Sequence, residues 1–310
     1  MKNQKLLSKS GIKLDISFKQ IDYDTGIDFI VDKLDKTCGM YLSSGIDYPG
    51  RYSRWELGFL NPPLEFIAIE NSVWINSLNP KGDAILELFT PLLSTHAHLE
   101  IDDKNSNKTK LKINIKPNNK IFPEEKRSLQ PSVVSVLRCL LEEFEQAFKS
   151  ANNTSFSDIG GVPFGFYGAF GYELLFQFEK DHKRSFERCG DEKLFHLFFV
   201  DNIYLLDKRK EKAYQCNLDL SKNKINTKNL CSNPYKKLKT KYSKQSSNPT
   251  IKPNISAKKY ENFVIKAKEK MRQGEIFEVV PSRKFLSDYP DKPSILFKRM
   301  QKNNPSPYEF

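Results

Sequence analysis

Two histidines and five cysteines are the side chains of this sequence best suited to bind a metal ion. His96 and His98 stand two residues apart, so on a strand both rings would lie on one face. A zinc site needs at least three protein ligands, and no third ligand accompanies the pair at a matching spacing. The cysteines form no Cys-x-x-Cys pair, and we expect reduced thiols and no metal site. They are Cys38, Cys139, Cys189, Cys216 and Cys231.

Glycines are densest between Gly160 and Glu173, where they alternate with aromatic residues. A phosphate-binding loop would place its glycines before a helix, with a Lys-Ser/Thr pair or an acidic residue in register. Neither companion is present. We interpret the stretch as a strand whose glycines let its backbone approach a neighbour, with direct ligand contact as the alternative.

Charge and composition limit the kinds of molecule that this chain is expected to bind. The chain has 310 residues, a formal net charge of +12 and 38% hydrophobic residues, enough for a core. A basic chain can bind nucleic acid or a membrane surface. The lysines, however, lie in loops beside many asparagines, and no nucleic-acid-binding motif accompanies them. We predict a solvated surface without nucleic-acid or membrane partners; a nucleic-acid binder, the alternative, would show a steep salt dependence of affinity.

The N-terminus and the hydropathy pattern give an expectation about location. Met1 to Lys5 leads into no apolar run, and no stretch approaches the ~20 apolar residues of a membrane span. We therefore expect a cytoplasmic protein.

Short strands and two helices account for most of the first 250 residues. Apolar spacing predicts a short helix over 27–34 and a long one that begins at Pro131 and runs to Phe148. Residues 194–218 form three apolar runs, which predicts an antiparallel meander with His196 as an ordinary sheet residue. Residues 83–93 fit either a helix or a strand, and 221–254 is typical of a linker. Further strands are expected over 12–23, 39–42, 64–75, with a turn at 70–72, and 111–115.

The last 55 residues carry the most consistent local signals. Ser256 can cap a helix with one apolar stripe, and Gly274 ends it. Residues 276–280, Ile-Phe-Glu-Val-Val, are β-branched or aromatic on both faces, which predicts a strand. A second helix should begin between 291 and 294, and the double-proline segment 304–310 cannot be helical.

Four segments resemble component I of anthranilate synthase. They are Gly-Glu-Ile-Phe-Glu-Val-Val-Pro-Ser at 274–282, Asn-Pro-Ser-Pro-Tyr at 304–308, the glycine-aromatic stretch at 165–172, and Ser-Gly-x-x-Tyr-Pro-Gly-Arg-Tyr-x-Arg-Trp at 44–55. The last is similar to the bacterial form fused to its glutamine amidotransferase. The resemblance implies an α+β fold: an antiparallel β-sandwich-type N-terminal domain with flanking helices over 1–250, then the first elements of an α/β-layered chorismate-binding domain over 251–310.

The resemblance also implies an activity and its partners. Component I converts chorismate and ammonia, which an amidotransferase domain or subunit releases from glutamine, to anthranilate and pyruvate in tryptophan biosynthesis. The family enzyme uses Mg²⁺, whose ligands and catalytic groups belong to sequence beyond Phe310, so we assign none here. The 310 residues are then expected to be inactive alone. The alternative is a catalytically silent regulatory module that binds tryptophan.

The resemblance places one binding site within the chain, the tryptophan feedback site. Ser44, Arg51, Pro307 and Tyr308 match its positions: Arg51 suits the carboxylate, and the Pro-Tyr pair suits the indole. Simple rigid loops are the alternative. The family's glutamate before the matching serine is Ser43 here, and the methionine after the matching tyrosine is Glu309. We expect Glu309 either to take over as partner of the tryptophan ammonium or to point to solvent.

Overall fold

The computed structural model describes residues 2–46, 54–116, 122–152, 156, 161–179, 192–236, 251–287 and 291–310. The chain divides into two compact units, one of Met1–Lys239 with Lys298–Phe310 and one of Thr240–Phe297. Each is described by itself below. The domain boundary at residue 250 stays a prediction.

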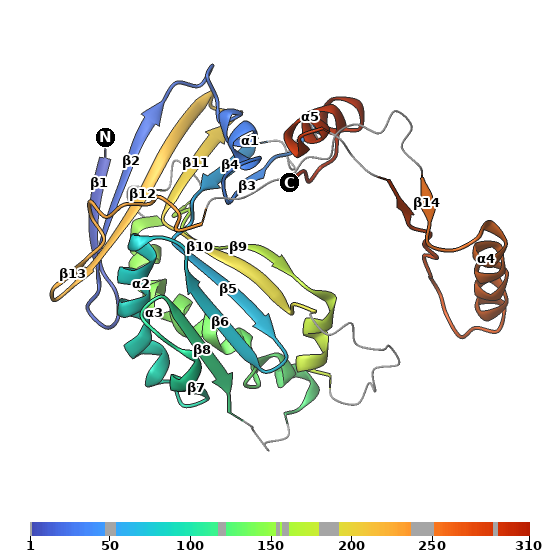
Figure 1. Cartoon of the computed structure of the whole chain (residues 1–310), viewed down its shortest axis with the longest axis horizontal. Coiled ribbons are helices and arrows are strands. Elements are labelled where there is room, and N and C mark those ends of the chain that lie inside the picture. Colours follow the sequence, from blue (N-terminus) through green and yellow to red (C-terminus); the bar gives the residue numbers. More distant parts are fainter. Residues whose placement is uncertain are drawn as a thin grey trace. The chain divides into compact units, whose positions relative to one another are not determined.

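An antiparallel sheet with the strand order β1-β2-β12-β11-β4-β3 forms one half of the first unit (Figure 1). Its centre pairs the N-terminal β2 with β12, with Ile16 opposite Leu218. Alternate residues of β2 are buried, as expected for a strand with one face on a core. The strands are β1 (Lys2–Leu7), β2 (Lys13–Ile21), β3 (Gly39–Leu42), β4 (Trp55–Leu60), β11 (Asn202–Asp207) and β12 (Lys212–Lys222), with β13 (Ile225–Asn226) paired to β12.

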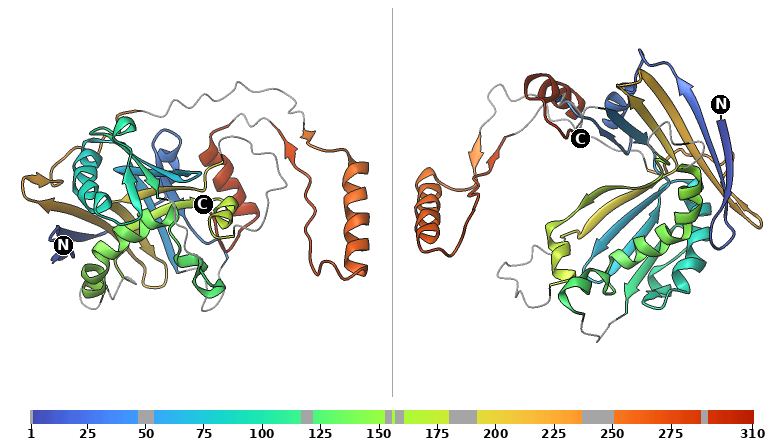
Figure 2. Two further views of the ribbon diagram at one scale, coloured as in Figure 1. Left: turned by 90° about the horizontal axis from the view of Figure 1, so that it is seen from below. Right: turned by 180° about the vertical axis from the view of Figure 1, so that it is seen from behind.

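A second antiparallel sheet has the order β7-β8-β6-β5-β10-β9, and α2 and α3 cover one of its faces (Figure 2). Asn79 caps α2 by accepting a hydrogen bond from Gly82 N, and Pro80 opens the helix. The ambiguous residues 83–93 are therefore helical. The elements are β5 (Leu64–Ile69), β6 (Ser72–Ser77), α2 (Pro80–Ser94), β7 (Leu99–Ile101), β8 (Lys110–Ile115), α3 (Val134–Asn152), β9 (Gly165–Phe170) and β10 (Phe195–Val200). The short helix α1 (Phe29–Leu34) packs against β3 and β4 of the first sheet.

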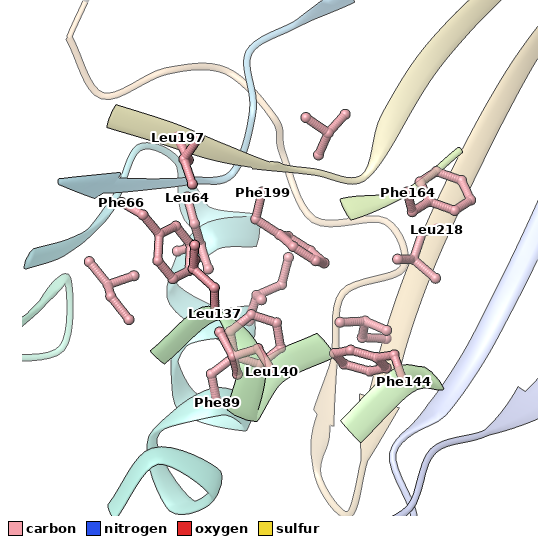
Figure 3. Close-up of a cluster of buried hydrophobic side chains, with 14 of the residues drawn as sticks. Leu64, Phe66, Phe89, Leu137, Leu140, Phe144, Phe164, Leu197, Phe199 and Leu218 are labelled. Atoms are coloured by element: carbon pink, nitrogen blue, oxygen red, sulfur yellow. The ribbon is translucent and has the colours of Figure 1, made fainter. Parts of the chain in front are cut away.

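Aromatic side chains from both helices and the second sheet meet in the core (Figure 3). Phe89 of α2 lies 5.3 Å from Phe199 of β10 and 5.9 Å from Phe144 of α3, measured between ring centroids. Phe66 of β5 meets Phe166 of β9 at 5.0 Å. Each such buried side chain stabilises the fold by about 1.5–3 kcal/mol through loss of contact with water. The stripe predicted on the long helix thus faces the core.

Gly168 shows why the glycine-aromatic stretch needs glycine. It pairs with Leu197 across the β9–β10 ladder, and a Cβ at this position would lie 2.1 Å from the carbonyl oxygen of His196. No side chain fits there. The structural interpretation of the stretch is confirmed for Gly165–Phe170, whereas Gly160 at its start lies outside the described residues.

The second unit contains α4 (Ala257–Arg272) and a two-residue pairing of β14 (Lys252–Pro253) with β15 (Phe285–Leu286). Ser256 caps α4 as predicted, through a 3.2 Å bond from Lys259 N. The predicted strand at 276–280 is wrong: these residues form no strand. A strand requires a ladder partner, and the described residues place none beside this segment.

α5 (Pro293–Asn303) begins where the second helix of this region was predicted, and residues 304–310 are not helical, also as predicted. The mixed architecture of antiparallel sheets and helices confirms the α+β class. None of the helices in the described residues is long and apolar enough to span a membrane.

Candidate functional site

The end of the chain pairs with the loop that follows β3. Ser43 N donates to Glu309 O at 2.9 Å, and Glu309 N donates to Ser43 O at 3.0 Å, which makes an isolated antiparallel bridge. Gly45 N adds a 2.9 Å bond to Ser306 O. All of these residues belong to the first unit. The two segments assigned to the feedback site therefore lie side by side.

The Glu309 carboxylate is buried in this junction, with the residue 9% exposed. Its Oε2 accepts hydrogen bonds from Ser43 Oγ and Gln301 Nε2, each at 2.9 Å, and its Oε1 accepts one from Ser306 N at 3.1 Å. The expectation that Glu309 points to solvent is wrong. Among the described residues, no cation pairs with this carboxylate, and three donors account for about three of its four lone-pair positions.

Gly45 provides the space for this carboxylate. A Cβ on Gly45 would lie 2.1 Å from Glu309 Oε1 and 2.9 Å from the Cβ of Pro305. Any side chain here would push the terminal segment away from the loop. The Ser-Gly pair of the 44–55 motif thus has a steric reason within this chain.

The other predicted site residues differ in how deeply they are buried. Ser44 is 6% exposed, and its Oγ donates to Ile46 O at 3.3 Å. Pro307 in the terminal segment is half-buried, whereas Tyr308 is 71% exposed. Arg51 lies outside the described residues. The structure therefore brings Ser44, Pro307 and Glu309 to one junction and leaves the Tyr308 ring accessible.

Sequence reasoning did not reveal that the end of β11 and the turn after it contact the 44–55 motif near both of its ends. Lys208 Nζ donates to Ser44 O at 3.2 Å and pairs with Glu56 Oε1 at 2.5 Å. Arg54 forms a 2.8 Å ion pair with the buried carboxylate of Asp207. In the sequence, Lys208 stands in a short polar segment between two apolar runs of the predicted meander, and only the long-range contacts reveal its role.

A buried tyrosine completes this polar cluster. Tyr41 donates its hydroxyl hydrogen to Glu56 Oε2 at 2.7 Å. Burial, reinforced by the neighbouring carboxylate of Glu56, raises the pKa of Tyr41, so the tyrosine remains a neutral donor. Lys208 and Tyr41 thus fix Glu56 from both sides and hold the loop at Ser44.

Acid should destabilise this arrangement through Asp207. Burial alone would raise the pKa of its carboxyl, but bonds from Arg54 and from the N–H groups of Lys210 and Arg209 hold that pKa below its ordinary value of 3.8. The unfolded chain then binds this proton first. The stabilisation is present above the unfolded pKa and is lost as pH falls through the folded one.

We therefore expect the free energy of unfolding to decrease below about pH 4, and Asp207→Asn to make this decrease shallower. Urea titrations between about pH 2 and pH 6 would measure the slope. Asp24→Asn is a control, because Asp24 is exposed. An acid slope in Asp207→Asn equal to that of the unchanged chain would contradict the assignment.

The histidines take structural positions. His196 Nε2 lies 2.6 Å from Glu65 Oε1 on the second sheet, a satisfied sheet histidine as interpreted. His96 and His98 lie in the turns after α2, not on a strand, with ring centroids 6.0 Å apart. The described residues contain no group of three histidine, cysteine or acidic side chains that could hold a metal ion. The described residues therefore offer no site for the magnesium ion that the resemblance implies, and no catalytic step is derived through that ion.

The fold is that of an α+β protein. Its terminal segment pairs with the loop after β3 of the first sheet, and a polar site lies where the two meet. The chain belongs to the family of chorismate binding enzymes, whose family model matches residues 99–310. It is 31% identical over 307 residues to an anthranilate synthase of Azospirillum brasilense, covering 97% of this chain and 38% of that protein. The predicted resemblance to component I of anthranilate synthase is confirmed.

Two relatives from Buchnera aphidicola, each an anthranilate synthase component 1, agree. The one from subsp. Acyrthosiphon pisum (strain APS) is 29% identical over 255 residues, covering 78% of this chain and 45% of its own. The one from subsp. Rhopalosiphum padi is 25% identical over 315 residues, covering 98% and 57%. The chain thus spans about half the length, or less, of the curated relatives it matches.

Proposed function

We propose that this chain forms the N-terminal part of an anthranilate synthase component I, which converts chorismate and ammonia to anthranilate and pyruvate in tryptophan biosynthesis. The observation that carries the proposal is the 31% identity to an anthranilate synthase across 97% of the chain. Ammonia would come from a glutamine amidotransferase domain or subunit. Magnesium and the groups that transfer protons would lie in sequence that the relatives have and this chain does not match.

Within that enzyme, this chain would supply regulation by tryptophan. The junction of Ser43 and Glu309 offers a buried carboxylate that no described cation neutralises, which suits an ammonium group. Pro307 and the exposed Tyr308 ring would provide the wall for the indole, Ser44 would shape the loop, and Arg51 would bind the tryptophan carboxylate. This assigns each polar end of the amino acid to a group of opposite charge.

Glu309 also accounts for the two departures from the family pattern. Ser43, where the family has glutamate, lies directly opposite Glu309 in the bridge. A carboxylate lost from one side of the bridge is thus present on the other. We infer that the carboxylate that pairs with the tryptophan ammonium stands at the position of Ser43 in the family and at Glu309 in this chain.

Purified 310-residue chain should form no anthranilate with chorismate and either ammonia or glutamine, because the residues that the structure describes contain no group of three histidine, cysteine or acidic side chains that could hold a metal ion for the elimination. Anthranilate fluorescence above a buffer control would measure it. Chorismate-dependent fluorescence from the purified chain would contradict this expectation. Tryptophan binding without activity would agree with both the enzyme part and the silent regulatory module.

The two hypotheses, an enzyme part and a silent regulatory module, predict different activities for a longer chain. The chain extended to the length of its relatives should produce anthranilate, and tryptophan should inhibit it. A chain so extended that binds tryptophan but produces no anthranilate would favour the regulatory module.

A further inference from the structure

One side chain at the junction of Ser43 and Glu309 belongs neither to the loop after β3 nor to the segment 304–310. Gln301, near the end of α5, donates from Nε2 to Glu309 Oε2 at 2.9 Å and to Ser43 Oγ at 3.1 Å. All three residues belong to the first unit, which includes 298–310. Helix α5 thus contributes to a site that the motifs assign to two other segments.

The hydrogen bonds among Gln301, Ser43 and Glu309 form a closed triangle. Ser43 Oγ accepts from Gln301 and donates to Glu309 Oε2 at 2.9 Å, and Gln301 reaches the same carboxylate oxygen directly. Only the amide nitrogen of Gln301 can make these contacts, because an amide oxygen has no hydrogen to donate to a carboxylate. Gln301 and Ser43 therefore fix the orientation of the Glu309 carboxylate from two directions.

The two oxygens of the Glu309 carboxylate have different surroundings. Oε2 accepts from both Ser43 and Gln301, which accounts for the two lone pairs of one carboxylate oxygen. Among the described residues, Oε1 accepts only from Ser306 N, at 3.1 Å, and it faces Gly45, which has no side chain to cover it. An ammonium group that pairs with this carboxylate would therefore donate to Oε1.

The charge of the donor at position 301 matters as much as its geometry. A lysine, which is of similar length, would bring a cation to the carboxylate, whereas the amide of Gln301 orients the carboxylate without adding charge. The negative charge of Glu309 then remains available to a ligand. A hydrogen bond with an ionised partner is roughly twice as strong as one between neutral groups, so a cationic ligand gains most from this arrangement.

We propose that Gln301 is the positioning residue that makes this site specific for a ligand with a free ammonium group. It holds Oε2 toward the protein, leaves Oε1 for the ligand and, as a neutral donor, does not compete for the charge of Glu309. The inference rests on the proposed binding of tryptophan at the junction and names the residue that sets its selectivity. Tryptophan should bind more tightly than indole-3-propionate, which keeps the ring and the carboxylate but lacks the amino group.

Isothermal titration of the full 310-residue chain with tryptophan and with indole-3-propionate tests the assignment. Gln301→Met keeps the length of the side chain and removes both donated bonds, and we expect it to weaken tryptophan binding by about tenfold. Gln301→Lys places a competing cation at the carboxylate and should weaken tryptophan binding further. Neither substitution should change the Kd of indole-3-propionate by more than about twofold, because that compound has no group for Glu309.

Two comparisons separate positioning from packing. Lys298→Met removes the ion pair between α5 and Asp32, one turn before Gln301, and should leave both affinities unchanged, because its side chains are 46% and 63% exposed and such pairs contribute little. In the background of Glu309→Ala, Gln301→Met should cause no further loss of tryptophan binding, because Gln301 acts through that carboxylate.

An equal loss of affinity for both compounds in Gln301→Met would overturn the proposal, because it would show that the residue only packs α5 onto the loop. Unchanged tryptophan binding in both Gln301 variants, or a further loss in the Glu309→Ala background, would also overturn it. Binding of neither compound by the unchanged chain would overturn both this inference and the proposed tryptophan site. Tryptophan binding that Glu309→Ala weakens and Gln301→Met does not would contradict only the role of Gln301.

Discussion

Glu309→Ala should weaken tryptophan binding by more than about tenfold in the chain extended to the length of its relatives. A hydrogen bond to a charged group contributes about 1.5–3 kcal/mol, which corresponds to roughly tenfold to more than a hundredfold in affinity. The substitution removes the buried carboxylate of the junction that we propose as the partner of the ammonium. Isothermal titration with tryptophan would measure the change in Kd.

Two comparison variants separate the charge from the packing. Glu278→Ala removes an exposed glutamate of the second unit and should leave Kd unchanged. Ser43→Glu/Glu309→Ser moves the carboxylate across the bridge and should restore most of the affinity that Glu309→Ala loses, because the two residues lie opposite each other. An unchanged Kd in Glu309→Ala, with the melting temperature also unchanged, would end the hypothesis.

Lys81→Met should lower the free energy of unfolding by about 3–5 kcal/mol, the cost of leaving buried charges without a partner. Lys81 Nζ lies 2.7 Å from Asp201 Oδ2 and 2.9 Å from Asp219 Oδ1, and its side chain is 10% exposed. Burial favours the neutral amine, but the two carboxylates outweigh it and raise the pKa of Lys81. Without the lysine, two carboxylates would face each other beside the core.

Urea unfolding at neutral pH would measure this loss. Lys149→Met is the matched control: its ion pair with Glu145 has side chains 69% and 54% exposed, and such surface pairs contribute little. Lys81→Met/Asp201→Asn/Asp219→Asn, which removes all three charges, should recover part of the stability. A loss of less than about 1 kcal/mol in Lys81→Met would show that water or rearrangement replaces the lysine.

Local patterns predicted most helices and strands of this chain because each depends on neighbours in sequence. The apolar stripe from Val133 to Phe148 and the cap at Ser256 specify their helices without knowledge of the rest. The strand predicted at 276–280 failed for the opposite reason. Its composition is right, but a ladder also needs a partner, and sequence composition does not say whether one is present.

The site was predictable only in part, for a related physical reason. Motifs identified Ser44 and the terminal segment, but the bond between Ser43 Oγ and Glu309 spans 266 residues, and no local pattern encodes such a contact. Lys81 likewise looks like a surface lysine between a proline and a glycine. Only the fold places it between Asp201 and Asp219, more than a hundred residues further along the chain.

The pairing of β2 with β12 constrains how the protein can fold while it is being made. Leu14 lies opposite Leu220, so roughly 200 residues must be added after β2 before its central partner exists. At about 5–20 residues per second, β1 and β2 would wait for about 10 to 40 s as an unfinished sheet with apolar side chains in water. We expect nascent chains that end before β12 to depend on chaperones, and the first unit to acquire resistance to proteases only once β12 has been synthesised.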